Sequence, residues 1–381
     1  MKIVLVTNIP NPYRLPLFNE MSRQLTLRGD EFTVLFAAEK YDRRKFILDR
    51  NEFQFNYAFL SSSVTTMGNE ERAYFSYGDL TKALKQEQPD VIIASGFSMA
   101  TMKSWWYGVK NNCRLIIWSG SVTIKGKGFS WLRNLQRRFL IHRATAFVAY
   151  GSRAKKYLLL NGARESAVFI AINTVDTAFF KRETQKLKEL NKEKDNLKHL
   201  TFVGYLSNRK KVEELLNCFR ILSEKRTDVV LDIIGDGSAK DSLMQKAKDD
   251  RIVQQVIFHG FKQKAELPEF LAKSDCFVFQ TGFDIWGLVL NEAMAAGLTC
   301  VVSPNAGAAD DLVIDGETGF VCNFADTEKT VRQLEEVLNH SERSIAIGKK
   351  AAEWIAEHAT IKVSAEGFIK AIDFAKGDVA G

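Results

Sequence analysis

Two carboxylates flank a glycine in the last third of the chain. Asp284 and Glu292 stand eight residues apart, with Gly287 between them. The apolar residues after Gly287 predict a buried helix that begins near this glycine, so Glu292 would project from its second turn. A helix N-terminus suits a phosphate, and carboxylates accept hydrogen bonds from sugar hydroxyls. The spacing indicates a site for a sugar attached to phosphate. The alternative is a helix-capping Asp and a solvated Glu.

A basic triplet, residues 209–211, follows an apolar run that ends at Val203. Such a triplet is able to contact an anionic group, and the alternative is an ordinary solvated loop.

The N-terminal apolar run is followed by a proline-rich segment, residues 7–16. Because proline fixes φ, we expect a stiff loop that holds Tyr13 and Arg14 in one pose. The Arg14 guanidinium is able to bind a phosphate or carboxylate with two parallel hydrogen bonds. The alternative is that Arg14 caps a neighbouring helix.

Short apolar runs that alternate with amphipathic stretches must position these residues. The first series of expected strands is Lys2–Thr7, Phe32–Ala37, Val91–Ser95, Arg114–Trp118 and Ala146–Ala149. The second is Leu200–Val203, Val229–Ile234, Val256–Phe258, Cys276–Phe279, Thr299–Val302 and Gly319–Val321. The alternation predicts two Rossmann-like α/β/α domains facing a central cleft, with ligands at the carboxyl ends of the strands.

The charge is unevenly distributed along the chain. The net charge of +7 divides into +11 over residues 1–180 and −4 over the remainder, and Val91 to Arg164 contains no Asp or Glu. The first half therefore predicts an anionic partner. Within it, residues 125–143 interleave basic and aromatic side chains, which suits contact with anionic lipid; the alternative is an ordinary amphipathic helix. Trp105, Trp106 and Tyr107 are a second candidate lipid contact, or core residues.

The segment around Asp284 resembles the donor-site signature of retaining glycosyltransferases of family 4, which have the GT-B fold. The signature spans FDIWGLVLNEAMAAGL, residues 283–298, and residues 307–319 resemble the family's following motif. Weaker matches lie at residues 173–179, 202–210 and 258–261. The start PNPYRLPLF, residues 10–18, is similar to a subset of bacterial members that build surface glycans.

The resemblance implies a role for each matching residue. Asp284 would bind the transferred sugar, Glu292 the ribose hydroxyls, and Lys210 with Arg209 the diphosphate. Further donor contacts would come from Gly204, Phe261, Lys262, Ile285, Trp286, Gly287 and Leu288. Acceptor contacts would come from Tyr13, Arg14 and Ser95, where Ser95 ends the strand at which many members carry a histidine.

These observations together predict a retaining hexosyltransferase that uses a nucleotide sugar, here a UDP-sugar, and a glycan or lipid-linked acceptor in surface polysaccharide or lipopolysaccharide synthesis. We expect no metal cofactor, no nucleic-acid partner, and a cytoplasmic location, peripheral on the inner face of the cell membrane. Expected domains are 1–175 and 200–358, followed by a helix at 359–381 that returns to the first domain. The two domains are joined by a linker at 176–199, whose polar part from Lys181 to His199 predicts a solvated linker or an exposed helix. The alternatives are a nucleotide-sugar epimerase or hydrolase on the same fold, and a non-enzymatic polyanion-binding protein.

Overall fold

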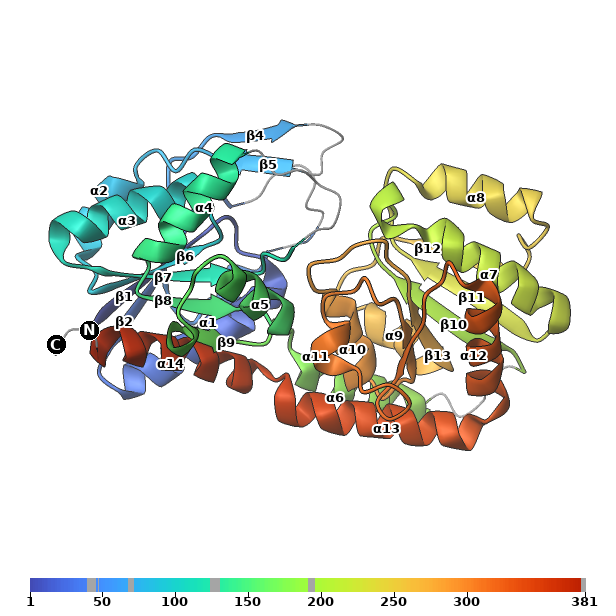
Figure 1. Ribbon diagram of the computed structural model, residues 1–381. Coiled ribbons are helices and arrows are strands. Elements are labelled where there is room, and N and C mark those ends of the chain that lie inside the picture. Colours follow the sequence, from blue (N-terminus) through green and yellow to red (C-terminus); the bar gives the residue numbers. More distant parts are fainter. Residues whose placement is uncertain (40–45, 47, 68–71, 124–130, 191–195, 378–381) are drawn as a thin grey trace. The chain divides into compact units, whose positions relative to one another are not determined.

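The computed structural model describes residues 1–39, 46, 48–67, 72–123, 131–190 and 196–377. The chain divides into two compact units. Unit 1 comprises Met1–Val175 and Ile361–Gly381, and unit 2 comprises Asp176–Thr360. Each unit is an α/β/α sandwich around a parallel sheet, so the expected fold class is confirmed (Figure 1). Among the described helices, none combines the length and the hydropathy that a bilayer crossing requires.

The sheet of unit 1 has seven parallel strands in the order β3-β2-β1-β6-β7-β8-β9. Its central strands are the continuous apolar runs of the sequence, which lack a polar face because helices cover both sides. The strands are β1 (Lys2–Thr7), β2 (Glu31–Phe36), β3 (Asn56–Phe59), β6 (Val91–Ser95), β7 (Arg114–Ser119), β8 (Ala146–Ala149) and β9 (Val168–Ile170).

The helices of unit 1 pack into two separate hydrophobic clusters, one on each face of the sheet. One face buries α1 (Leu15–Leu27) and the C-terminal α14 (Ile361–Gly377). The other buries α2 (Leu80–Glu87), α3 (Met99–Asn111), α4 (Trp131–Arg143) and α5 (Ser152–Leu160). A hairpin of β4 (Val64–Met67) and β5 (Arg72–Phe75) forms a separate two-stranded sheet. The two helix layers lie on opposite sides of the strands in Figure 1.

Unit 2 has six parallel strands in the order β12-β11-β10-β13-β14-β15. The strands are β10 (Lys198–Val203), β11 (Val229–Ile234), β12 (Val256–Gly260), β13 (Cys276–Phe279), β14 (Cys300–Val302) and β15 (Phe320–Val321). The helices are α6 (Thr177–Leu190), α7 (Val212–Lys225), α8 (Lys240–Asp249), α9 (Leu267–Lys273), α10 (Leu288–Ala295), α11 (Ala309–Leu312), α12 (Thr327–Asn339) and α13 (Ser341–His358).

Each sheet has one place where the order of strands reverses. In unit 1 the chain builds outward from β1 through β2 and β3, then returns to place β6 on the other side of β1. In unit 2 the same reversal lies between β10 and β13. Loops that leave neighbouring strands in opposite directions open a crevice there, which is where ligands of doubly wound sheets bind. Loops 7–15 and 203–211 each leave a strand at such a reversal.

Some elements differ from those that the sequence predicted. Residues 177–190, expected in a linker or an exposed helix, form α6, which packs against α9 and α10 of unit 2 and buries Phe180. Residues 191–195 of that segment lie outside the described residues. Strands β3 and β9 and the β4–β5 hairpin were not predicted from the sequence. Their runs are short, and edge strands bury less apolar surface than central ones.

Candidate active site

The loops that follow β10 and β13 meet through an ion pair. Lys210 Nζ lies 2.5 Å from Asp284 Oδ2. Because β10 and β13 are the neighbouring strands at the reversal of the sheet, this pair stands at the carboxyl edge where a ligand is expected. The structure therefore brings together the two residues to which the sequence assigned the diphosphate and the transferred sugar.

Lys210 is enclosed by protein atoms, with only 6% of its surface exposed. Burial lowers the pKa of its ammonium, and the Asp284 carboxylate opposes that shift. The ammonium also lies 5.1 Å from the centre of the Phe279 ring. A desolvated cation interacts strongly with a phosphate because little water screens it.

The other two residues of the basic triplet point elsewhere. Arg209 Nη1 donates to the carbonyl oxygen of Phe283 at 2.5 Å. Lys211 is exposed and pairs with Glu214 at 2.9 Å. Arg209 therefore braces the loop that carries Asp284, and Lys210 is the member of the triplet that contacts the carboxylate itself.

Asp284 is held by backbone hydrogen bonds to the loop after β14. Its N–H donates to the Asn305 carbonyl at 3.1 Å, and the Gly307 N–H donates to the Asp284 carbonyl at 3.0 Å. A Cβ at Gly307 would stand 1.9 Å from the Ile285 carbonyl oxygen, so only glycine permits this approach. Three loops of unit 2 thus fix the Asp284 carboxylate.

Helix α10 begins where the sequence predicted. Gly287 is its N-cap, with φ of 102° in the left-handed region, and a Cβ there would meet the Phe279 ring at 2.3 Å. Trp286 is buried and its Nε1–H donates to Asn291 Oδ1 at 3.0 Å, which makes it a packing residue. Ile285 is 45% exposed and Leu288 is partly buried, beside the N-terminus of the helix.

Glu292 lies on the second turn of α10 and is partly buried. Burial raises the pKa of its carboxyl group to about 8, and Lys264 opposes this shift only in part. Burial therefore favours the neutral acid form of Glu292 in the free protein. A carboxylate with two donating hydroxyls would be stabilised there, since hydrogen bonds to the charged form favour ionisation.

The remaining donor candidates lie on neighbouring loops of unit 2. Gly204 directly follows β10, and its carbonyl oxygen would lie 1.9 Å from a Cβ at Gly235, so the ends of β10 and β11 approach closely. Phe261 follows β12 and is 45% exposed. Lys262 pairs with Glu266 at 3.2 Å, an interaction at the N-terminus of α9. Two of the donor candidates donate hydrogen bonds to Asp284: Lys210 Nζ to Oδ2 at 2.5 Å and the Trp286 backbone N–H to Oδ1 at 3.5 Å.

In unit 1 the proline-rich loop places Arg14 in an aromatic cage. Its Nη2 donates to the Tyr150 hydroxyl at 2.7 Å, and its guanidinium lies 4.4 Å from the centre of the Trp118 ring. Nη1 reaches Thr7 Oγ1 at 3.4 Å. Interaction with Tyr13 and Tyr150 raises the pKa of Arg14 against the opposing effect of its burial. The guanidinium therefore stays charged beside the reversal point of this sheet.

The other sequence candidates of unit 1 are only partly placed. Ser95 ends β6, which neighbours β1, and it pairs in register with Trp118 of β7. Of the stretch 125–143, residues 131–143 form α4, while residues 125–130, including Lys125, Lys127 and Phe129, lie outside the described residues. Across the described ranges, His, Cys, Asp and Glu form no group of three with metal-binding geometry.

Sequence reasoning missed the residues that support the candidates. Tyr150 and Trp118 hold Arg14 from distant strands, and no local spacing identifies such partners. Lys264 is the charged residue that lowers the pKa of Glu292 against the effect of burial. Its ammonium pairs with Asp176 at 3.8 Å and lies 4.6 Å from the centre of the Phe179 ring. The sequence signal for this cluster is the weak family match at residues 173–179, which contains Asp176 and Phe179.

The match to a known family falls on unit 2. Residues 182–354 match the family model described as glycosyl transferases group 1. The segment includes Lys210, Asp284 and Glu292. The family resemblance that the sequence predicted is thereby confirmed.

Curated relatives share the same part of the chain. The chain is 28% identical over 183 residues to N-acetyl-alpha-D-glucosaminyl L-malate synthase of Bacillus anthracis, covering 48% of this chain and 47% of that protein. It is 32% identical over 170 residues to a sulfoquinovosyl transferase of Arabidopsis thaliana, covering 43% and 32% respectively. The chain thus spans about half or less of the length of these relatives.

Solved structures match the whole fold. HepE of Anabaena, solved in complex with UDP, has a TM-score of 0.78 and 16% identity, covering 98% of this chain and all of that one. The lipopolysaccharide outer core galactosyltransferase WaaB, in its apo form, has a TM-score of 0.69 and 17% identity, covering 98% and 99%. At this identity the likeness defines the fold alone, which is GT-B.

Proposed function

We propose that the chain is a retaining glycosyltransferase that moves a sugar from a UDP-sugar to a hydroxyl of a lipid-linked glycan in bacterial surface polysaccharide or lipopolysaccharide synthesis. The observation that carries this proposal is the buried Lys210–Asp284 pair at the reversal point of the unit 2 sheet. The family match of the same unit and the UDP bound in the HepE structure support it.

The proposal gives each group of the site a role in the reaction. The acceptor hydroxyl oxygen forms a bond to the anomeric carbon on the face from which the diphosphate departs, and the bond from that carbon to the phosphate oxygen breaks. The hydroxyl proton passes to the departing diphosphate. Lys210 stabilises the negative charge that develops on the leaving oxygen, and Asp284 orients the sugar hydroxyls. Glu292 accepts hydrogen bonds from the ribose diol. The reaction is proposed to need no metal.

Lys210→Met tests the proposal against a matched neighbour, Lys211→Met. Lys210 is buried against Asp284, whereas Lys211 is exposed and pairs with Glu214. We expect Lys210→Met to weaken UDP binding about tenfold and to lower the rate of sugar transfer about a hundredfold, the size of effect seen when one oxyanion-stabilising group is lost. Lys211→Met should change each less than about twofold.

The measurements are calorimetric UDP affinity and release of UDP from UDP-sugars with and without a glycan acceptor. GDP serves as the control nucleotide. Equal loss of UDP affinity in both variants would contradict the assignment of Lys210. Rapid turnover of UDP-sugar that no acceptor accelerates would instead identify an epimerase or hydrolase.

A further inference from the structure

Unit 1 exposes large apolar side chains on two neighbouring helices. Six of them, at fractional exposures between 55% and 71%, form what we name the α3–α4 surface. They are Met99, Trp106 and Val109 of α3 and Trp131, Leu132 and Leu135 of α4. None is used by the candidate active site.

The exposed sides of the two helices face the same side of the unit. Ala100 and Tyr107 of α3 and Leu140 and Ile141 of α4 are buried in one cluster on the same face of the sheet. The helices also touch each other, with Trp105 against Phe139 edge to face at 4.8 Å. Helices that bury one side on the same sheet face turn their other sides to the same solvent region (Figure 1).

The exposed apolar residues follow helical spacing. On α3, Met99, Trp106 and Val109 are seven and three residues apart, and on α4, Trp131 and Leu135 are four apart. Such spacings place side chains in one stripe along a helix. The surface is therefore two adjacent apolar stripes, each with its polar side chains at the margins.

The charge around these stripes has one sign. Lys110, Arg133 and Arg138 are exposed on the same helices, and the Lys110 ammonium lies 4.9 Å from the centre of the Trp106 ring. The 74 residues from Val91 to Arg164 contain 13 Lys and Arg and no Asp or Glu. An apolar stripe with uniformly cationic margins is complementary to an anionic lipid surface.

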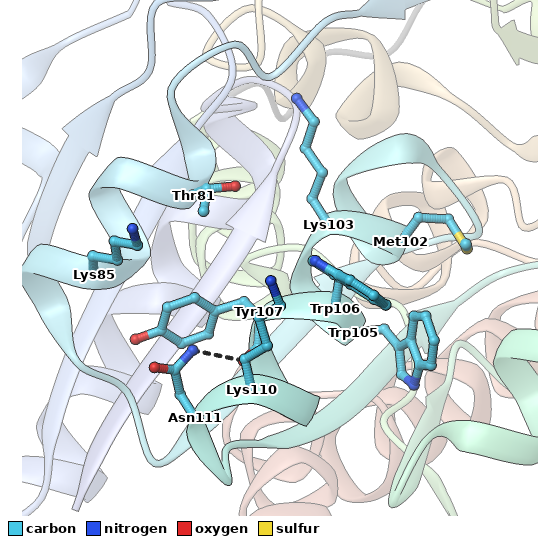
Figure 2. Close-up of a pocket in the computed structure, with 9 residues that line it drawn as sticks. All are labelled: Thr81, Lys85, Met102, Lys103, Trp105, Trp106, Tyr107, Lys110 and Asn111. Carbon is cyan, nitrogen blue, oxygen red and sulfur yellow. Dashed lines mark hydrogen bonds between the residues drawn. The ribbon is translucent and has the colours of Figure 1, made fainter.

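A hollow of about 400 Å³ lies beside the α3 stripe, between α2 and α3. Figure 2 shows Thr81 and Lys85 of α2 on one side, and Trp105 and Trp106 of α3 on the other. Three lysines line it, Lys85, Lys103 and Lys110, with no acidic residue among its lining. Lys103 Nζ donates to the Ser76 and Tyr77 carbonyls at 3.2 and 2.7 Å, which holds its ammonium in place. A lipid phosphate would find cationic partners here.

We propose that the α3–α4 surface docks unit 1 on a bilayer that contains anionic phospholipid, with the apolar stripes at the acyl boundary and the lysine-lined hollow at headgroup level. Exposed Trp, Leu, Met and Val favour this partner over nucleic acid, which would use the cations but leave the aliphatic side chains in water. The inference deepens the proposed function, since it would bring the enzyme to the membrane that carries a lipid-linked acceptor.

Co-sedimentation with vesicles tests the docking surface in the full chain. The probes are phosphatidylcholine vesicles and phosphatidylcholine vesicles with about one-third phosphatidylglycerol. We expect binding to the second and at least tenfold weaker binding to the first. Binding should weaken as NaCl rises from about 0.1 to about 0.5 M, because salt screens the attraction.

Two pairs of substitutions test whether vesicle binding depends on the α3–α4 surface or on exposed apolar side chains in general. Trp106→Glu with Leu135→Glu should lower partitioning onto the anionic vesicles at least tenfold. Ile345→Glu with Leu27→Glu is the matched control, because these side chains are 70% and 75% exposed outside this surface. The control should bind within about threefold of the parent chain, apart from the change of net charge that both pairs share.

UDP affinity, measured on the same samples, distinguishes failure of this inference from failure of the proposed function. Both variant pairs should bind UDP as the parent chain does. The docking proposal would be overturned, with the donor site unaffected, if the parent protein bound DNA but not anionic vesicles, or bound neither. Equal loss of vesicle binding in both variant pairs would also overturn it. Absent UDP binding alongside normal vesicle binding would overturn only the proposed donor chemistry.

Discussion

The carboxyl group of Glu292 is predicted to couple UDP binding to the release of a proton. It carries a pKa raised to about 8 from an ordinary value of 4.5, because burial disfavours its charged form. Hydrogen bonds from ribose hydroxyls would replace the lost hydration of the carboxylate, and so would lower the pKa of Glu292 and favour its charged form. Binding of UDP near neutral pH should therefore release protons from the protein.

Glu292→Gln tests this raised pKa through stability. Between pH 4.5 and 8 the folded state holds a proton on Glu292 that the unfolded state has released, so stability falls as pH rises through this window. The full shift would be worth a few kcal/mol, reduced by partial solvent contact. We expect the variant, which does not titrate, to gain at least about 1 kcal/mol relative to the parent chain on going from pH 5 to pH 8.

Urea unfolding at a series of pH values measures that difference. Glu266→Gln is the control, since hydrogen bonding to Gln263 and Lys262 lowers the pKa of that exposed carboxyl and gives it no such window. A pH dependence of stability that is identical in the parent and Glu292→Gln proteins would show that Glu292 ionises normally. Calorimetry of UDP binding in two buffers of different ionisation enthalpy would then also find no proton release assigned to Glu292.

At the scale of elements, close backbone approaches determine where the site residues stand. The Asp284 carboxylate depends on pairing between the loop after β13 and the loop after β14, and Gly307 is the point of closest approach. The helix that carries Glu292 likewise starts at a glycine against an aromatic ring. These glycines are needed for their lack of a side chain rather than for flexibility.

Gly307→Ala should separate these loops. The new methyl group would meet backbone oxygen at 1.9 Å, so the Asp284 loop must move, at a cost of about 1–3 kcal/mol. Because Asp284 is assigned to the sugar and not to the nucleotide, we expect affinity for UDP-sugar to fall more than affinity for UDP. Gly377→Ala, where a Cβ meets no atom within 4 Å, is the control for both readouts.

The informative measurement is the ratio of the two dissociation constants. A Gly307→Ala protein that is destabilised but keeps the parent ratio of UDP-sugar to UDP affinity would indicate that the β14 loop supports folding only. A raised ratio with a normal ratio in Gly377→Ala would support a positioning role for this loop.

The sequence predicted those elements that combine a strong local signal with burial. Strands β11 and β13 fall at their predicted residues, since a buried parallel strand is an unbroken apolar run. The start of helix α10 at Gly287 followed from the apolar pattern after that glycine. The polar sequence of residues 177–190 predicts a solvated linker or an exposed helix, and the few apolar residues of α6 suffice to pack it against unit 2. The Tyr150 partner of Arg14 lies 136 residues away, and contacts of that range leave no local pattern.

For the molecule as a whole, the excess positive charge lies in unit 1. Unit 1 contains 28 Lys and Arg against 16 Asp and Glu, a net charge of +12, whereas unit 2 contains 25 against 30, a net charge of −5, and yet includes the residues assigned to a diphosphate. Recognition of the proposed donor would therefore be local, through a buried lysine and a helix N-terminus. The positive field of unit 1 would act on the proposed acceptor and its surroundings.

This division predicts that Arg14 influences acceptor use without influencing the nucleotide. Arg14→Lys keeps the charge but loses the planar fork that reaches Tyr150 and Thr7. We expect kcat/KM for the acceptor to fall at least about tenfold, with UDP affinity within about twofold of the parent value. Tyr150→Phe removes only the hydroxyl partner of Arg14, so its kcat/KM for the acceptor should lie between the values of the parent chain and of Arg14→Lys. A melting curve for each variant controls for loss of the aromatic cage. If Arg14→Lys instead weakened UDP binding and transfer by the same factor, Arg14 would serve the donor, and the excess charge of unit 1 would no longer indicate an anionic acceptor at this loop.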